Sequence, residues 1–97
     1  MSVQIPLSAI PWQTLSVVLD GQNCLISLRQ VAENLFCDLT VNDIEIFKGA
    51  ICADRSAINQ YPSRYFSGTL YFVDTKGTEN PQYEGLTDRW VLLYDGE

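Results

Sequence analysis

Short runs of alternating apolar and polar residues, separated by two-residue turn signals, constrain the fold of this chain more than any other feature of its sequence. Two such runs, residues 13–20 and 24–29, place six apolar residues at every second position: Leu15, Val17, Leu19, Cys24, Ile26 and Leu28. A period of two is typical of a half-buried strand. The dipeptide Asp20-Gly21 lies between the runs, and Asp-Gly in this setting indicates a tight hairpin turn. We therefore predict a β-hairpin whose alternating apolar set faces the core.

The pattern continues through the first half of the chain. The next run places Leu35, Cys37, Leu39 and Val41 on one face. A turn at residues 31–34 precedes this run, and Asn42-Asp43 makes a tight turn into a strand that begins at Ile44 and runs toward Cys52. Gly49 interrupts that last strand, and a glycine inside a strand pattern predicts a bulge or a bend. Four strands in a meander account for this half.

The second half contains two apolar runs, residues 66–73 and 90–94, on either side of a long polar turn. Residues 53–64 connect the halves: Asp54 is a candidate N-cap and Pro62 a stop for one helical turn, but an irregular connection carrying Tyr61 and Tyr65 fits as well. At the start, Pro6 and Pro11 favour an extended N-terminal arm or an edge strand over residues 1–11.

Six strand signals without a convincing helix predict an all-β fold. Residues 1–97 are long enough for one domain, and 46% of them are apolar, which suits a chain with a packed core. We expect a small antiparallel β-barrel or sandwich with at most one short helical turn.

Charge excludes several classes of partner. The formal net charge is −6, from 12 acids against 6 bases. A basic stripe for phosphate neutralisation is absent, which argues against nucleic acid and against an anionic membrane surface as partners. The opening residues lack the charge and apolar pattern of a signal peptide, and no apolar run approaches the length of a membrane span. We expect synthesis in the cytoplasm.

The sequence also offers little to catalysis. It contains no histidine, which removes the side chain best suited to proton transfer near neutral pH. Nucleophile, Walker and dinucleotide glycine motifs are absent. The three cysteines, Cys24, Cys37 and Cys52, lie within apolar runs without close spacing, so we predict buried reduced thiols. No catalytic residue, cofactor or metal site is predicted.

The final polar turn contains four acids, Asp74, Glu79, Glu84 and Asp88. Two interpretations of these acids are open. They could converge on a hard cation, although no regular calcium-loop pattern is present. Turn chemistry is the favoured alternative. In that interpretation Asp74 starts an Asx-type turn, Asn80-Pro81 forms a turn, and Gly77 and Gly85 take positive φ.

Aromatic residues gather in the second half, at Tyr61, Tyr65, Phe66, Tyr71, Phe72, Tyr83, Trp90 and Tyr94. Stacking platforms for single-stranded nucleic acid pair such residues with a positive groove, whereas this chain is acidic. Core filling and a protein interface explain them better. If Leu70 and Phe72 face the core, Tyr71 and Val73 face outward. If Val91 and Leu93 face the core, an outer stripe remains for protein contact, which we predict to contain Tyr71, Trp90, Leu92 and Tyr94.

Four segments together resemble a known family. They are Ile5-Pro6-Leu7, the hairpin Leu19 to Cys24, GTLYFVDTKG from Gly68 to Gly77, and NPQYEGLTDRWVLLY from Asn80 to Tyr94. Their order and spacing are similar to the cyanophage-type (Pam3-like) phage baseplate plug family, whose members share F-x-D-T-x-G, D/N-P-x-Y-x-G-L and R-x-x-L-L-Y motifs. The last two segments are the specific ones. Thr87-Asp88 departs from the Gly or small polar residue common before the arginine.

The resemblance implies a non-enzymatic, all-β structural subunit of a contractile-tail baseplate, encoded by a phage or a prophage. It implies a place in the virion tail near the hub that seals or continues the tail tube, with other baseplate or tail-hub proteins as partners and a homo-oligomer as a further option. It brings no catalytic or cofactor residues. Two alternatives remain from the residues: a free-standing binding module that uses the aromatic strip, and a metal-dependent enzyme that uses the loop acids.

Overall fold

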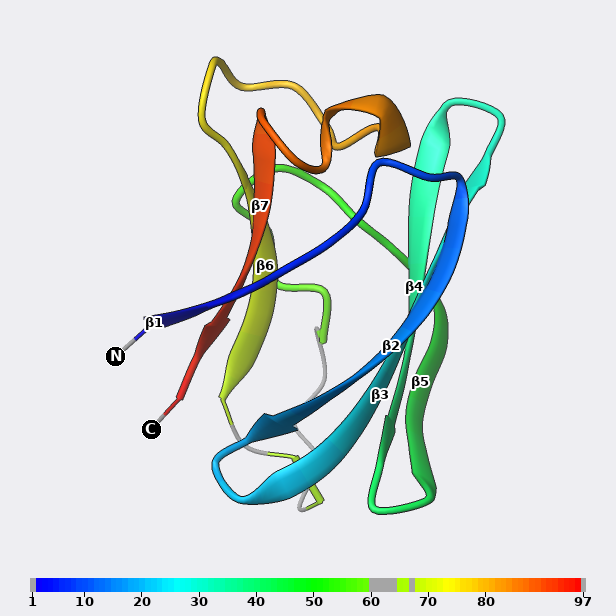
Figure 1. Cartoon of the computed structure of the whole chain (residues 1–97), viewed down its shortest axis with the longest axis vertical. Helices are drawn as coiled ribbons and strands as arrows, with labels where there is room; N and C mark the ends of the chain where they lie inside the picture. Colours follow the sequence, from blue (N-terminus) through cyan, green and yellow to red (C-terminus); the bar gives the residue numbers. More distant parts are fainter. Residues whose placement is uncertain (1, 60–64, 67, 97) are drawn as a thin grey trace.

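The computed structural model describes residues 2–59, 65–66 and 68–96. These residues form seven strands in two antiparallel sheets that face each other as a sandwich (Figure 1). The strands are β1 (Ser2–Ile5), β2 (Trp12–Leu19), β3 (Gln22–Val31), β4 (Asn34–Val41), β5 (Ile44–Ile51), β6 (Thr69–Asp74) and β7 (Trp90–Asp95). The all-β prediction is confirmed. The strand beyond the six expected is β1.

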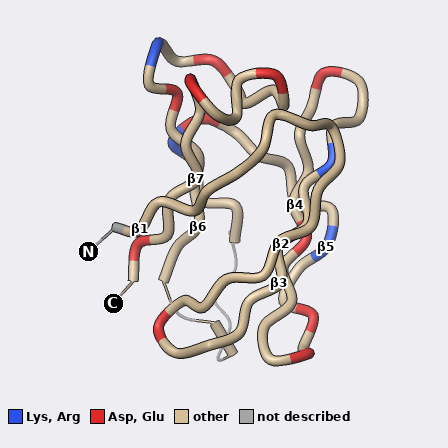
Figure 2. The backbone as a smooth tube through the Cα atoms, in the orientation of Figure 1, with Lys and Arg blue, Asp and Glu red and all other residues tan. Residues whose placement is uncertain are grey.

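The two sheets differ in how the chain builds them. The meander sheet has the order β2-β3-β4-β5, so each strand pairs with its neighbour in sequence. The hairpin sheet has the order β1-β7-β6, and β1 therefore lies at an edge, paired with the last strand of the chain. Charged residues occur mostly in the turns and loops of the backbone, while β1 and β2 contain none (Figure 2).

Tight turns set the register of the meander sheet. Asp20 and Gly21 have φ of 51° and 76°, and Asn42 and Asp43 have φ of 49° and 67°. Positive φ at both central residues matches the right-handed twist of the strands on either side, which is why Asp, Asn and Gly occupy these positions. Both predicted two-residue turns are confirmed.

The predicted irregularity at Gly49 is confirmed as a bulge in β5. The register between β4 and β5 shifts between Cys37 and Thr40, and Gly49 has a φ of 69°. The backbone N–H of Gly49 donates to the carboxylate of Asp38 at 2.7 Å, so the side chain of β4 replaces the ladder bond that the bulge removes.

The core lies between the sheets and contains the alternating set expected from the sequence. Its buried residues in the meander sheet include Leu19, Cys24, Ile26, Leu28, Leu35, Cys37, Leu39 and Val41. Leu15 and Val17 of the edge strand β2 face the same way but are half-buried. All three cysteines are buried and free, as predicted.

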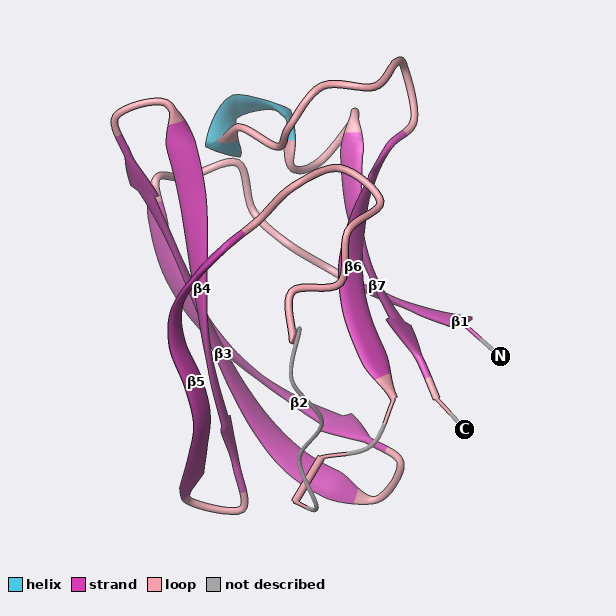
Figure 3. Cartoon of the chain, turned by 180° about the vertical axis from the view of Figure 1, so that it is seen from behind, coloured by secondary structure: helices cyan, strands magenta, loops and turns pink. Residues whose placement is uncertain are grey.

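Residues 52–59 form an irregular connection, not the alternative helical turn. Asp54 and Ala57 make isolated bridges to Phe72 and Tyr71 of β6, which extends the hairpin sheet along that edge. The expected roles of Tyr61 and Pro62 fall outside the described residues. One short 3-10 helix, Tyr83–Gly85, lies instead in the polar turn between β6 and β7 (Figure 3). No helix of the described residues is long and apolar enough to cross a membrane.

We predict that the native thiols resist modification. Burial raises the pKa of Cys24, and a side-chain hydrogen bond with Cys52 together with burial raises the pKa of Cys37 well above its usual value. Because the thiolate is the reactive species, the native chain should react with a disulfide reagent far more slowly than the same chain in guanidinium, where all three cysteines react. A Ser8→Cys variant supplies an exposed control thiol. Native reaction of the three cysteines at the control's rate would contradict their burial.

Candidate functional site

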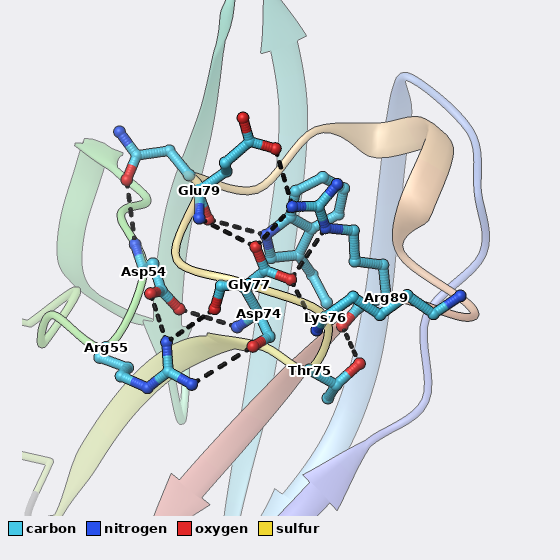
Figure 4. Close-up of polar contacts among 10 residues, drawn as sticks. Asp54, Arg55, Asp74, Thr75, Lys76, Gly77, Glu79 and Arg89 are labelled. Carbon is cyan, nitrogen blue, oxygen red and sulfur yellow. Dashed lines mark hydrogen bonds and ion pairs between the residues drawn. The ribbon is translucent and has the colours of Figure 1, made fainter.

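The polar turn between β6 and β7 is organised around one buried carboxylate, that of Asp74 at the end of β6 (Figure 4). Asp74 is 1% exposed. Its Oδ1 accepts hydrogen bonds from the backbone N–H of Lys76 at 2.9 Å and from Arg89 Nε at 2.8 Å. Its Oδ2 accepts from the backbone N–H of Glu79 at 2.9 Å and from Arg89 Nη2 at 2.7 Å. Both oxygens are thus saturated, and the carboxylate holds the start and the end of the turn together.

Arg89 links this anchor to the start of β7. Besides its bidentate contact with Asp74, its Nη2 donates to Glu79 Oε2 at 2.7 Å. The guanidinium stacks over the ring of Trp90, 4.5 Å from the centroid. The indole N–H of Trp90 in turn donates to the backbone carbonyl of Glu79 at 3.0 Å. Planar bidentate pairing and stacking are both properties of arginine that lysine lacks.

A second layer comes from the connection between the sheets. The Oδ1 of Asp54 accepts the backbone N–H of Asp74 at 2.7 Å. Arg55 pairs with Asp54 and donates to the backbone carbonyls of Gly77 and Asp74, each at 3.3 Å. The side-chain oxygen of Asn80 accepts the N–H of Asp54 at 3.2 Å. The connection and the turn therefore fix each other.

The charges of this network are compensated within it. The hydrogen bonds from Arg89 hold the pKa of Asp74 well below its usual range, against the opposing effect of burial, and the bonds from Glu79 and Lys76 lower it further. The same contact with Asp74 raises the pKa of Arg89. A proton donor or acceptor for catalysis would need a pKa nearer the working pH. This arrangement suits a structural clamp.

Turn chemistry explains Asp74, as the favoured interpretation predicts. The hydrogen bond from the backbone N–H of Lys76 to the Asp74 carboxylate is an Asx-type contact. The four acids do not gather round a common point. Asp74 and Glu79 share Arg89, whereas Asp88 is exposed and lies 3.9 Å from Lys76. Among the described residues no group of three or more His, Cys, Asp or Glu side chains could hold a metal ion.

The prediction for the two turn glycines is wrong, because neither has positive φ. Instead, space requires a glycine at residue 85 and leaves little room at residue 77. A Cβ on Gly77 would lie 3.3 Å from both Arg89 Nη2 and Asp74 Oδ2, and a Cβ on Gly85 would overlap the ring of Trp90. Asn80-Pro81 is not a turn of its own; Asn80 serves as the hydrogen-bond partner of Asp54.

The predicted interface also assumed the wrong outward-facing residues in β7. Trp90, Leu92 and Tyr94 face the core, with exposed fractions of 5%, 0% and 2%, whereas Val91 and Leu93 face outward and are half-buried. The register explains this, because Phe72 opposes Leu92 and Leu70 opposes Tyr94, and opposed residues share a face. In β6 the phase is as expected, with Leu70 and Phe72 in the core and Tyr71 and Val73 outward.

An apolar outer stripe therefore exists on the last hairpin, but three of its four members differ from the prediction. We call it the outer patch, and it consists of Tyr71, Val73, Val91 and Leu93. Tyr71 opposes Leu93 and Val73 opposes Val91, so the four side chains form two cross-strand pairs on one face. All four are half-buried.

The residues that carry the family resemblance hold the fold together. Besides the Asp74 anchor, the phenol of Tyr94 in the last strand donates to the Asp20 carboxylate of the first hairpin at 2.6 Å. Gly68 lies against that phenol, where a Cβ would come within 2.6 Å of the oxygen. Ile5 pairs with Leu92 and is buried. Thr87 and Asp88, where the sequence departs from the pattern, are exposed.

A comparison with protein families agrees with the resemblance. The family model described as "Cyanophage baseplate Pam3 plug gp18" matches residues 2–97, which is nearly the whole chain. A search of curated proteins finds no match.

We predict that the Asp74 anchor makes stability fall in acid. The pKa of Asp74 is lower in the folded than in the unfolded chain, where it is about 3.9, so the anchor stabilises fully above that value and loses its contribution as pH falls further. Asp74→Asn should lower the melting temperature at pH 7, and this deficit should shrink as the pH falls below about 4. The exposed Asp88→Asn is the matched control and should melt like the parent. A deficit independent of pH would contradict the ionised anchor.

We also predict that Gly85→Ala is destabilising for steric reasons. The added methyl would force the Trp90 ring or the 3-10 turn to move, and overpacking of this kind costs about 1–3 kcal/mol. Chemical denaturation measures the loss directly. Thr87→Ala, two residues away and exposed, is the control and should change little. Equal stability of the two variants would show that the turn tolerates a side chain at residue 85.

Proposed function

Because the chain belongs to the cyanophage baseplate plug family, we propose that it docks on its neighbours in the baseplate through the outer patch of its hairpin sheet. Membership makes the chain a non-enzymatic plug protein of the phage tail baseplate, located in the virion tail and associated with other baseplate proteins. The proposal adds which surface makes that association and what the surface requires of its partner.

The observation that carries the proposal is the apolar outer face of β6 and β7. A strand with one face in the core normally presents polar residues on the other face. Here the outward positions of both strands hold Tyr71, Val73, Val91 and Leu93. A contiguous apolar face of this kind is typical of a contact surface, and tyrosine is enriched in such surfaces. Tyr71 is the one residue of the original interface prediction that remains in it.

The chemistry of the partner follows from the patch and from the charge of the chain. The central contact is apolar, so the partner supplies an apolar surface of matching shape. The chain has 12 acids against 6 bases, so a partner with basic residues around that surface is favoured electrostatically. A tail-hub protein or a tube protein with these features is the proposed neighbour.

The interior of the domain suits a passive plug. Residues 1–97 act as one unit in this proposal, because the Asp74 anchor ties the long turn to β7 and Tyr94 ties β7 to the first hairpin. A subunit that closes a channel gains from such cross-links, since a rigid docking surface loses little conformational entropy on binding.

The structure makes the residues needed for the two alternative functions inaccessible or already occupied by hydrogen bonds. A free-standing binding module would use Trp90 and Tyr94 as an exposed aromatic strip, and both are buried. A metal-dependent enzyme would use the loop acids, but the Asp74 oxygens already accept four hydrogen bonds.

The test is a double variant, Tyr71→Ser with Leu93→Ser, introduced into the gene of a phage or prophage that encodes this chain. It removes one cross-strand pair of the outer patch and leaves the core intact. Loss of a central apolar contact costs about 2 kcal/mol or more of binding, about 30-fold in affinity, so purified tails should contain much less of the variant. Mass spectrometry of the tails measures the incorporated amount.

Leu25→Ser is the matched control, because Leu25 is an exposed leucine on the outer face of the meander sheet. Circular dichroism and thermal melting confirm that each variant is folded. Normal incorporation of a folded Tyr71→Ser/Leu93→Ser variant would refute the outer patch as the docking surface. It would leave the family assignment intact.

A further inference from the structure

Strand β2 is the open edge of the meander sheet. It pairs with β3 over eight consecutive residues without a shift in register, and among the described strands β3 is the one that pairs with it. A long regular edge strand presents a row of unpaired N–H and C=O groups, which can pair with a strand of another chain. Natural proteins usually protect such edges with charge, proline, bulges, a covering segment or a very short edge strand.

The other three edges are protected in these ways. β5 carries the bulge at Gly49 with Lys48 beside it. β6 is flanked by the bridges from Asp54 and Ala57. β1 has four residues. By contrast, β2 has eight residues in unbroken register with β3, and its sequence WQTLSVVL contains no charge and no proline.

The side chains of β2 also leave apolar area exposed on both faces. On the outer face Trp12 is 72% exposed and Val18 is 63% exposed, the highest values among the large hydrophobic residues that the structure describes. On the inner face Leu15 and Val17 are half-buried, whereas their partners Ile26 and Cys24 in β3 are buried. A further strand beside β2 would cover both pairs.

The charge distribution favours a second copy of the chain as that strand. Two molecules that each carry a net charge of −6 repel each other, and the repulsion is weakest where they meet through uncharged surface. The first charged residue of the sequence is Asp20, so β2 lies wholly within an uncharged segment of 19 residues (Figure 2). Close approach of two copies at β2 brings no like charges together within the strands.

The sequence of β2 is also self-complementary in one register. In an antiparallel pair about a two-fold axis normal to the sheet, opposed residues must lie on the same face. An axis at Leu15 satisfies this condition and places Trp12 opposite Val18 and Thr14 opposite Ser16. Pairs of an aromatic with a β-branched residue stabilise a sheet. Asp20 falls opposite Ile10, so no two acids meet.

We propose that two copies of this chain pair antiparallel through β2 about an axis at Leu15, joining their meander sheets into one continuous eight-stranded sheet. The contact covers the exposed side chains of Trp12 and Val18 in both copies. It also provides hydrogen-bond partners for the backbone groups along both β2 edges. It is independent of the outer patch, which lies on the other sheet, so either proposal can fail without the other.

The test is light scattering of the purified full chain after size exclusion, over a series of concentrations. We expect the wild type to have twice the monomer mass at high concentration. In Thr14→Lys/Ser16→Lys, two pairs of lysines face each other across the axis, and the dimer should weaken at least about tenfold. In Thr14→Lys/Ser16→Glu each lysine opposes a glutamate, so the dimer should persist. This charge swap tests the register as well as the surface.

Thr14 and Ser16 are exposed, so the folded monomer should tolerate both variants, which melting curves check. Hydrogen exchange of wild-type β2 gives a second measurement: protection of its amides should rise with protein concentration. The Tyr71→Ser/Leu93→Ser variant should remain dimeric. A monomeric wild type, concentration-independent exchange, or a lysine variant that dimerises like the wild type would overturn the proposal. The first of these outcomes would favour a strand from another baseplate protein at this edge.

Discussion

The burial of the Asp74 carboxylate is the interaction on which the second half of the structure depends. A carboxylate removed from water is costly unless charge and hydrogen bonds compensate it, and here Arg89 and two backbone N–H groups do so. Residues 75–89 have little regular structure, so this contact determines where the turn returns to the sheet. The same arginine stacks on the buried ring of Trp90, so the anchor also contacts the first core residue of β7.

Local signals were enough to predict the meander sheet. Its strands alternate cleanly, and its turns contain Asp20-Gly21 and Asn42-Asp43, which adopt the positive φ that such turns need. Short sequence separation leaves few alternative pairings, so the inward set from Leu19 to Val41 could be assigned from the sequence. The bulge at Gly49 also followed from a local break in the pattern.

The phase of β7 could not be predicted in the same way, since residues 90–94 are apolar on both faces and alternation carries no information there. The register with β6 decides it, and that register depends on the pairing of Asp74 with Arg89, fifteen residues apart. A charged pair at the two ends of a polar turn was the available signal, but the four acids of the turn offered several partners. β1 was ambiguous for a similar reason: its partner β7 is at the opposite end of the chain.

The residues that fix the fold and the residues of the outer patch alternate along the same hairpin, and Leu93 belongs both to the R-x-x-L-L-Y motif and to the outer patch. The side chains of Asp74 and Tyr94 are buried and fix the geometry of the hairpin, whereas Tyr71, Val73, Val91 and Leu93 face outward. Because successive residues of a strand face opposite ways, one hairpin can meet both demands. The inward residues are constrained by packing within this chain, while the outward ones are constrained by the shape of a neighbour. The inward residues therefore specify the scaffold, and the identity of the docking partner has to be sought in the outward residues, whether or not they belong to a motif.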